Sequence, residues 1–96
     1  MSSGYVIAHV EVTNPAQYEE YKKWSSAAMQ AHGAEVCARG GKVEVLEGDW
    51  SPSRVVILKF PSFEQAKAFY ESPEYLKARE ARAGAAVMRM IAVEGI

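Results

Sequence analysis

The sequence has little cysteine and no long apolar segment, and each shortage excludes a class of protein. One cysteine among 96 residues, Cys37, excludes an internal disulfide framework and any metal site built from several cysteines. No apolar run approaches the roughly 20 residues that a membrane-spanning helix needs, and Met1–Gly4 lacks the basic region of a secretory signal. We therefore expect a reduced, cytoplasmic protein with no membrane partner.

The sequence also lacks an excess of charge of either sign. Eleven Lys and Arg residues against twelve Asp and Glu leave a net charge of −1, which gives no electrostatic reason to expect a nucleic-acid partner. Apolar residues make up 49% of the chain and charged residues 24%, as in ordinary folded domains. At this length we expect one domain that covers residues 1–96.

Hydrophobic periodicity predicts six elements in the order βαββαβ. Alternating or continuous β-branched segments predict the strands, which are 5–12, 34–47 (interrupted at Gly40-Gly41), 54–60 and 85–94. Apolar residues at helical spacing predict one helix from Pro15 to about His32 and a second after Ser62, restarted at Ser72-Pro73 and ending near Gly84. Gln17 stands where a capping-box side chain would reach back to the first helix start.

This order predicts an α+β fold, the ferredoxin-like βαββαβ arrangement, with a four-stranded antiparallel sheet and both helices on one face. The opposite face has nothing in the chain to cover it. Yet segments 54–60 and 85–94 have apolar residues at both odd and even positions, so both of their faces are apolar. The first strand has one apolar face and one mixed face of apolar and polar residues, and the mixed face carries Tyr5 and Ile7. We therefore predict a homodimer closed sheet to sheet, a dimeric α+β barrel.

Several segments together resemble a known family. They are 5–15 (YVIAHVEVTNP), 38–41 (ARGG), 45–48 (VLEG), 54–61 and 70–75 (YESPEY). The chain is similar over nearly its whole length to the bacterial family called domain of unknown function 1330, of the dimeric α+β-barrel superfamily. The resemblance implies a ferredoxin-like dimer and no particular reaction. Distant superfamily relatives include cofactor-free monooxygenases and lactone isomerases, but a shared fold is only an analogy for function.

Two residues are the candidate catalytic pair. His9 lies mid-strand on the mixed face, where a neutral imidazole can act as a general base. Arg39 precedes two glycines that can bend the strand and aim its planar fork at a carboxylate or enolate. The alternatives are structural: an interface histidine bonded to a neighbour such as Glu11, and an arginine paired with Glu11, Glu35 or Glu94.

Four residues are candidate ligand contacts. Tyr75 and Arg79 share a face of the helix that restarts at Pro73, where backbone N–H groups favour an anion. Tyr21 and Trp24 supply aromatic surface between helix and sheet. The same pattern also fits a solvated helix face and an ordinary aromatic core. Whether the pocket lies in that layer or inside the dimer barrel stays open.

The sequence-based hypothesis is acid–base chemistry without a cofactor, on a small carboxylated or aromatic metabolite, with His9 as base and Arg39 as anion holder. No metal site is predicted, because His9 and His32 lie on different elements without a matching ligand cluster. The alternatives are a binding module that does not turn its ligand over, and a structural protein that presents Trp50 to another protein.

Overall fold

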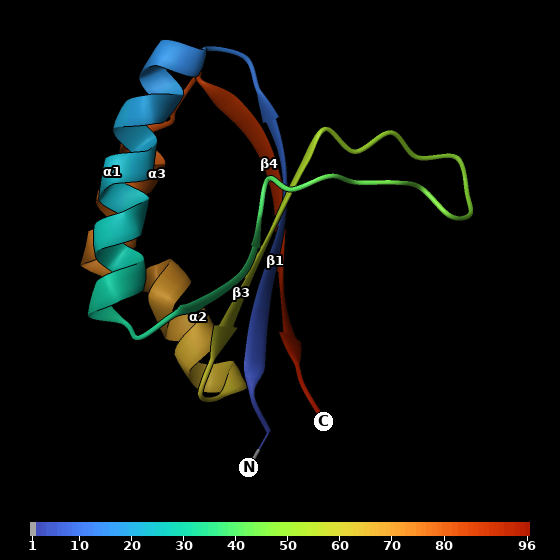
Figure 1. The fold of residues 1–96 in the computed structure, drawn as a ribbon. Coiled ribbons are helices and arrows are strands. Elements are labelled where there is room, and N and C mark those ends of the chain that lie inside the picture. Colours follow the sequence, from blue (N-terminus) through green and yellow to red (C-terminus); the bar gives the residue numbers. More distant parts are fainter. Residues whose placement is uncertain (1) are drawn as a thin grey trace.

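A computed structural model describes residues 2–96 and contains four strands and three helices (Figure 1). The elements in chain order are β1 (Gly4–Val12), α1 (Pro15–Ala31), β2 (Glu35–Arg39), β3 (Arg54–Phe60), α2 (Phe63–Glu71), α3 (Pro73–Ala81) and β4 (Ala86–Glu94). The strands form one antiparallel sheet in the order β2-β3-β1-β4. The predicted βαββαβ order is therefore confirmed, with the second helix divided into α2 and α3.

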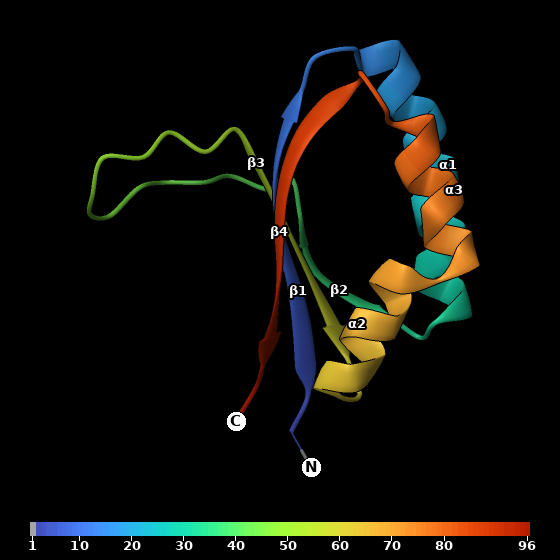
Figure 2. The ribbon, with the colours of Figure 1, turned by 180° about the vertical axis from the view of Figure 1, so that it is seen from behind.

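All three helices cover the same face of the sheet (Figures 1 and 2). Alternation along each strand sends every second side chain towards them, so Val6, Ala8 and Val10 of β1 are buried while their neighbours are more exposed. The core between the layers adds Leu58 and Phe60 of β3 to helix residues, which are Tyr18, Tyr21, Ala28, Ala66, Phe69, Tyr75 and Ala78.

All three helices begin after a residue whose polar side chain caps the first turn. The side chains of Asn14, Ser62 and Ser72 accept hydrogen bonds from backbone N–H groups at the starts of α1, α2 and α3. The capping-box role expected for Gln17 is wrong. Its side-chain nitrogen instead donates to the carbonyls of Ala81 and Ala83, 3.0 and 2.7 Å away, because the end of α3 lies beside the start of α1.

The strand expected over 34–47 is much shorter in the structure. β2 ends at Arg39, and residues 40–53 leave the sheet as a projecting arm (Figures 1 and 2). Gly40 has a φ of 72°, a left-handed conformation that turns the chain away from the ladder. Beyond this turn the alternating Val and Glu residues have no neighbouring strand, so the β-pattern of the sequence is not realised as sheet.

The sheet face away from the helices carries apolar side chains that no helix covers, and Trp50 of the arm lies beside His9 on this face. Ile7 of β1 pairs with Ile57 of β3 on one side and with Ile91 of β4 on the other, so three isoleucines form a row across the sheet. Val87 and Ile91 are each 59% exposed. We call this surface the outer face.

The helices of the described chain include none long and apolar enough to cross a membrane.

Candidate functional site

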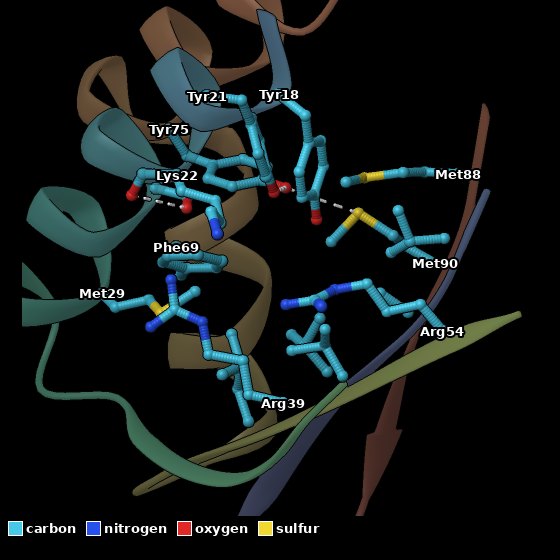
Figure 3. A pocket seen from close by; sticks show the side chains of 16 residues that line it. Tyr18, Tyr21, Lys22, Met29, Arg39, Arg54, Phe69, Tyr75, Met88 and Met90 are labelled. Atoms are coloured by element: carbon cyan, nitrogen blue, oxygen red, sulfur yellow. Dashed lines mark hydrogen bonds between the residues drawn. The ribbon is translucent and has the colours of Figure 1, made fainter. Parts of the chain in front are cut away.

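A small pocket, with about 30 Å³ of free volume, lies between the sheet and the helices (Figure 3). Its walls are mostly apolar and aromatic, with a few polar groups. The lining residues are Val6, Ala8, Val10, Tyr18, Tyr21, Lys22, Ser25, Met29, Arg39, Arg54, Val56, Leu58, Phe69, Tyr75, Met88 and Met90. Such a combination of apolar walls and a few convergent polar groups is typical of a small-molecule site.

Arg54 is the central cation of the pocket. It opens β3 opposite Val10, so it lies on the helix-facing parity of the strand and its side chain reaches into the pocket. Its guanidinium carbon lies 5.8 Å from the centre of the Tyr18 ring. Its Nε is buried and has no hydrogen-bond acceptor within residues 2–96. A buried donor of this kind is stabilised when a ligand supplies an acceptor.

Gly40 makes room for that guanidinium. A Cβ at position 40 would lie 2.3 Å from Nη1 of Arg54 and 2.7 Å from its Cζ. The Gly40 N–H also donates to the carbonyl of Val55, 3.0 Å away, which holds the turn beside the start of β3. The glycines predicted to bend the strand at Arg39 therefore do bend it, and the bend also admits Arg54.

Arg39 and Lys22 are two further cations at the pocket. The Arg39 Nη2 donates to the hydroxyl of Ser26, 3.2 Å away, and the Lys22 ammonium lies 2.9 Å from the Glu19 carboxylate at the surface. In Figure 3 the side chains of Arg39, Arg54 and Lys22 point towards the same space. None of the described residues that line the pocket is acidic. The pocket therefore carries a positive potential that favours an anion.

Two tyrosines close the pocket on the helix side. The hydroxyl oxygens of Tyr21 and Tyr75 are 2.7 Å apart, and the Tyr75 hydroxyl donates to the sulfur of Met90, 3.6 Å away. Because the Tyr75 hydroxyl proton is donated to Met90, the Tyr21 hydroxyl is the donor to the Tyr75 oxygen. Burial raises the pKa of both tyrosines, and for Tyr21 the neighbouring Tyr75 raises the pKa further. Both hydroxyls are therefore neutral near pH 7 and are not bases.

This raised pKa predicts a pH dependence of stability. The unfolded Tyr21 ionises near pH 10.0, whereas the folded residue ionises only at higher pH. Its contribution to stability is therefore complete below pH 10 and is lost as pH rises above 10, at up to about 1.4 kcal/mol per pH unit. Tyr21→Phe is expected to lower the free energy of unfolding by about 1 kcal/mol at pH 7, because one hydrogen bond is missing. Above pH 10 its free energy of unfolding should fall less steeply with pH than that of the wild type. Urea unfolding from pH 7 to 11 measures both curves, and parallel curves would contradict this assignment.

The structure brings three of the predicted site residues together and separates the others from them. Arg39, Tyr21 and Tyr75 all line the pocket. His9 lies on the outer face, where its Nε2 accepts from the backbone N–H of Ser53 at 3.3 Å and its ring lies 6.0 Å from that of Trp50. The sheet therefore stands between His9 and Arg39, and one subunit does not place them in a single cavity.

Trp24 and Arg79 lie outside the pocket. Trp24 is 40% exposed, and the Lys77 ammonium lies 5.5 Å from the centre of its ring. Arg79 packs with its guanidinium carbon 4.5 Å from the centre of the Tyr70 ring. The cationic side chains of Lys77 and Arg79 therefore each cover an aromatic ring of the helix layer.

Sequence reasoning missed Arg54 and Lys22. A signal for Arg54 was available, because positions 54, 56, 58 and 60 share one face of the strand and the other three are apolar. A charged residue on a core-facing parity is unusual unless it is paired or lines a cavity. Lys22 gave no such signal, because it lies among charged residues on the helix surface.

Residues 2–96 contain no group of three or more His, Cys, Asp or Glu side chains that could hold a metal ion.

Comparison with solved structures confirms the fold. A protein of unknown function from Rhodopseudomonas palustris is 21% identical with a TM-score of 0.75, and the match covers 99% of this chain and 83% of that one. SnoaB, a cofactor-independent oxygenase from Streptomyces nogalater, is 14% identical with a TM-score of 0.65, covering 97% and 92%. A dimeric ferredoxin-like protein of unknown function from Thermobifida fusca is 15% identical with a TM-score of 0.59, covering 96% and 92%.

Among curated proteins no relative matches this chain. One protein family does, over residues 3–96, which is nearly the whole chain and agrees with the resemblance carried by its sequence segments. The chain belongs to the family described as Domain of unknown function (DUF1330).

Proposed function

We propose that this protein binds a small aromatic or otherwise apolar monocarboxylate in the pocket between sheet and helices. The observation that carries the proposal is the Arg54 guanidinium, which reaches into a largely apolar pocket with its buried Nε lacking an acceptor. A carboxylate matches a planar guanidinium fork with two parallel hydrogen bonds. Arg39 adds charge at the same pocket, where no lining residue is acidic, whereas the charge of Lys22 is paired with the Glu19 carboxylate outside the pocket.

The rest of the pocket fits the body of such a ligand. Tyr18, Phe69 and Met88 present aromatic and thioether surface, and the Tyr21–Tyr75 pair is satisfied without a ligand. An aromatic ring is therefore stabilised by apolar burial and by contact with the tyrosine and methionine side chains. A phosphate or a dianion without an apolar body would leave most of these walls in contact with nothing.

Binding is better supported than acid–base catalysis. The described lining residues include no histidine, cysteine or carboxylate, and burial keeps both closing tyrosines protonated. The pocket can thus stabilise a negative charge that the ligand already carries, but it offers no group to remove a proton. His9 has no part in this proposal because it lies on the other side of the sheet.

We also propose that the protein is a homodimer joined through the outer face. Two structural neighbours, from Thermobifida fusca and Bacteroides fragilis, are described as dimeric. In this chain Ile7, Ile57 and Ile91 form an apolar row across the face that the helices do not cover, in which Ile91 is 59% exposed and the other two are half-buried. Exposed contiguous apolar surface of this kind is typical of an interface, and a two-fold pair is the commonest closed assembly.

Isothermal titration calorimetry with benzoate and benzamide tests the binding proposal. The two probes share the ring and differ in the charge of one substituent. Benzoate is expected to bind at least about tenfold more tightly, because a charge-assisted hydrogen bond contributes about 1.5–3 kcal/mol. Equal affinities, or no heat from either probe, would overturn the proposal. The protein alone gives the heat of dilution as the baseline.

A further inference from the structure

A second cavity lies on the far side of the pocket wall formed by β4. It is an open groove of about 350 Å³ between α2, the end of α3 and β4. Its floor and walls are largely apolar, and its polar residues are Lys67, Tyr70, Glu71 and Arg82. Val6, Met88 and Met90 line both this groove and the pocket. The two spaces are therefore separated by only one layer of side chains.

Two of those three shared residues are methionines. Met88 and Met90 extend from β4 into the pocket (Figure 3), both also line the groove, and both are only partly buried. Methionine is unbranched, has three rotatable side-chain bonds and adapts to neighbours of different shape at little energetic expense. Joining the groove to the pocket requires rotation of these side chains, and for Met90 this breaks the hydrogen bond that its sulfur accepts from the Tyr75 hydroxyl.

The groove contains a second arginine in the same condition as Arg54. The Nε of Arg82 is buried and has no hydrogen-bond acceptor within residues 2–96. Its guanidinium carbon lies 5.9 Å from the centre of the Tyr21 ring, so it stands beside the tyrosine pair that closes the pocket. Of the two buried side-chain donors without acceptors in the described chain, one lines the pocket and the other lines the groove.

We propose that the pocket and the groove together form one elongated site, with Met88 and Met90 as its movable partition. This inference rests on the proposed function and names its ligand more closely. The ligand class is an elongated aromatic carboxylate with an acceptor oxygen at the end remote from the carboxylate. The carboxylate binds Arg54, the apolar body passes the methionines, and the remote oxygen accepts from Arg82. Each orphaned guanidinium donor then has a partner.

The test compares a short probe with a long one. Benzoate carries one carboxylate and tests the Arg54 end alone, whereas biphenyl-4,4′-dicarboxylate carries a second carboxylate across the partition. In the wild type the long probe is expected to bind at least about tenfold more tightly than benzoate, because it adds a charge-assisted hydrogen bond and buried apolar surface. Calorimetric titration measures both affinities.

Two variants locate the two ends of the site, and a third is their control. Arg82→Gln should remove the advantage of the long probe and leave the affinity for benzoate within about twofold. Arg54→Gln should weaken both probes by at least about tenfold. Lys77→Gln, an exposed change on α3 outside both cavities, is the matched control and should change neither affinity.

Each contrary result has a distinct meaning. Benzoate binding with no advantage for the long probe would overturn the elongated site and leave the proposed function intact. A long probe that still binds Arg54→Gln at wild-type affinity would show the groove to be a separate site, which also overturns the inference. If neither probe binds the wild type, the proposed function and this inference both fail.

Discussion

Arg54→Met is expected to abolish measurable binding of benzoate while leaving the empty protein at least as stable as the wild type. The variant removes the guanidinium that holds the carboxylate, so affinity should fall by about 100-fold, which corresponds to about 2.7 kcal/mol. Stability should not fall in parallel, because the wild-type Nε is a buried donor without an acceptor in the described chain. An apolar side chain of similar length removes this unsatisfied donor and the desolvation penalty that it carries.

The measurements are calorimetry for binding and thermal unfolding for stability. Arg54→Lys is the conservative variant: it keeps the charge but loses the planar fork, so it should retain part of the affinity. Lys23→Met removes an exposed charge from the outside of α1 and should change neither quantity. A loss of melting temperature in Arg54→Met as large as that of an ordinary core truncation would show that Arg54 serves the fold. The binding site would then lie elsewhere.

Ile57→Glu is expected to convert a dimer into a folded monomer. Ile57 lies on the outer face of the central strand β3, opposite Ile7. A carboxylate at this position is solvated in a single subunit but would be buried without a partner in a sheet-to-sheet pair. A two-fold interface contains the change twice. Burial of each charge disfavours association by several kcal/mol, so the dissociation constant should rise by more than about 100-fold.

Light scattering at micromolar concentration gives the mass directly. The wild type should show twice the 10.6 kDa of one chain, and Ile57→Glu should show the mass of one. Leu76→Glu is the matched control, because Leu76 is 46% exposed on α3, on the helix side of the molecule. It should stay dimeric. A wild type that is a well-folded monomer would remove the dimer proposal and leave the pocket, which one subunit forms by itself.

The sequence predicted the elements well where local signals were strong. Asn14-Pro15, Ser62 and Ser72-Pro73 combine capping side chains with prolines that suit a first helical turn, and all three helices begin there. The prediction of one strand over 34–47 was wrong. Alternation of Val and Glu indicates only that these residues suit a strand. Whether a strand forms also depends on a neighbour to pair with, and Gly40 turns the chain away from β3.

The candidate site shows the same division. Tyr21, Tyr75 and Arg39 were predicted from their residue types and positions on their elements, and they do line one pocket. His9 was grouped with Arg39 although they lie on different strands, and strand parity alone could not tell whether they share a face. The register shift between Val36 and Ala38 changes the parity of β2, so Arg39 lies opposite Val56 on the helix side while His9 lies opposite Val55 on the outer face.

By itself the sequence determined the α+β order, the helix starts and the presence of an apolar sheet face beyond what the helices cover. These properties follow from periodicity and capping, which act between residues close in the chain. Only the tertiary structure decided which charged side chains face one another across the pocket, and that Arg54 and Arg82 are left with buried donors to satisfy. Those facts depend on register, on a bulge and on the space beside a glycine, and such long-range relations are not written in any local pattern.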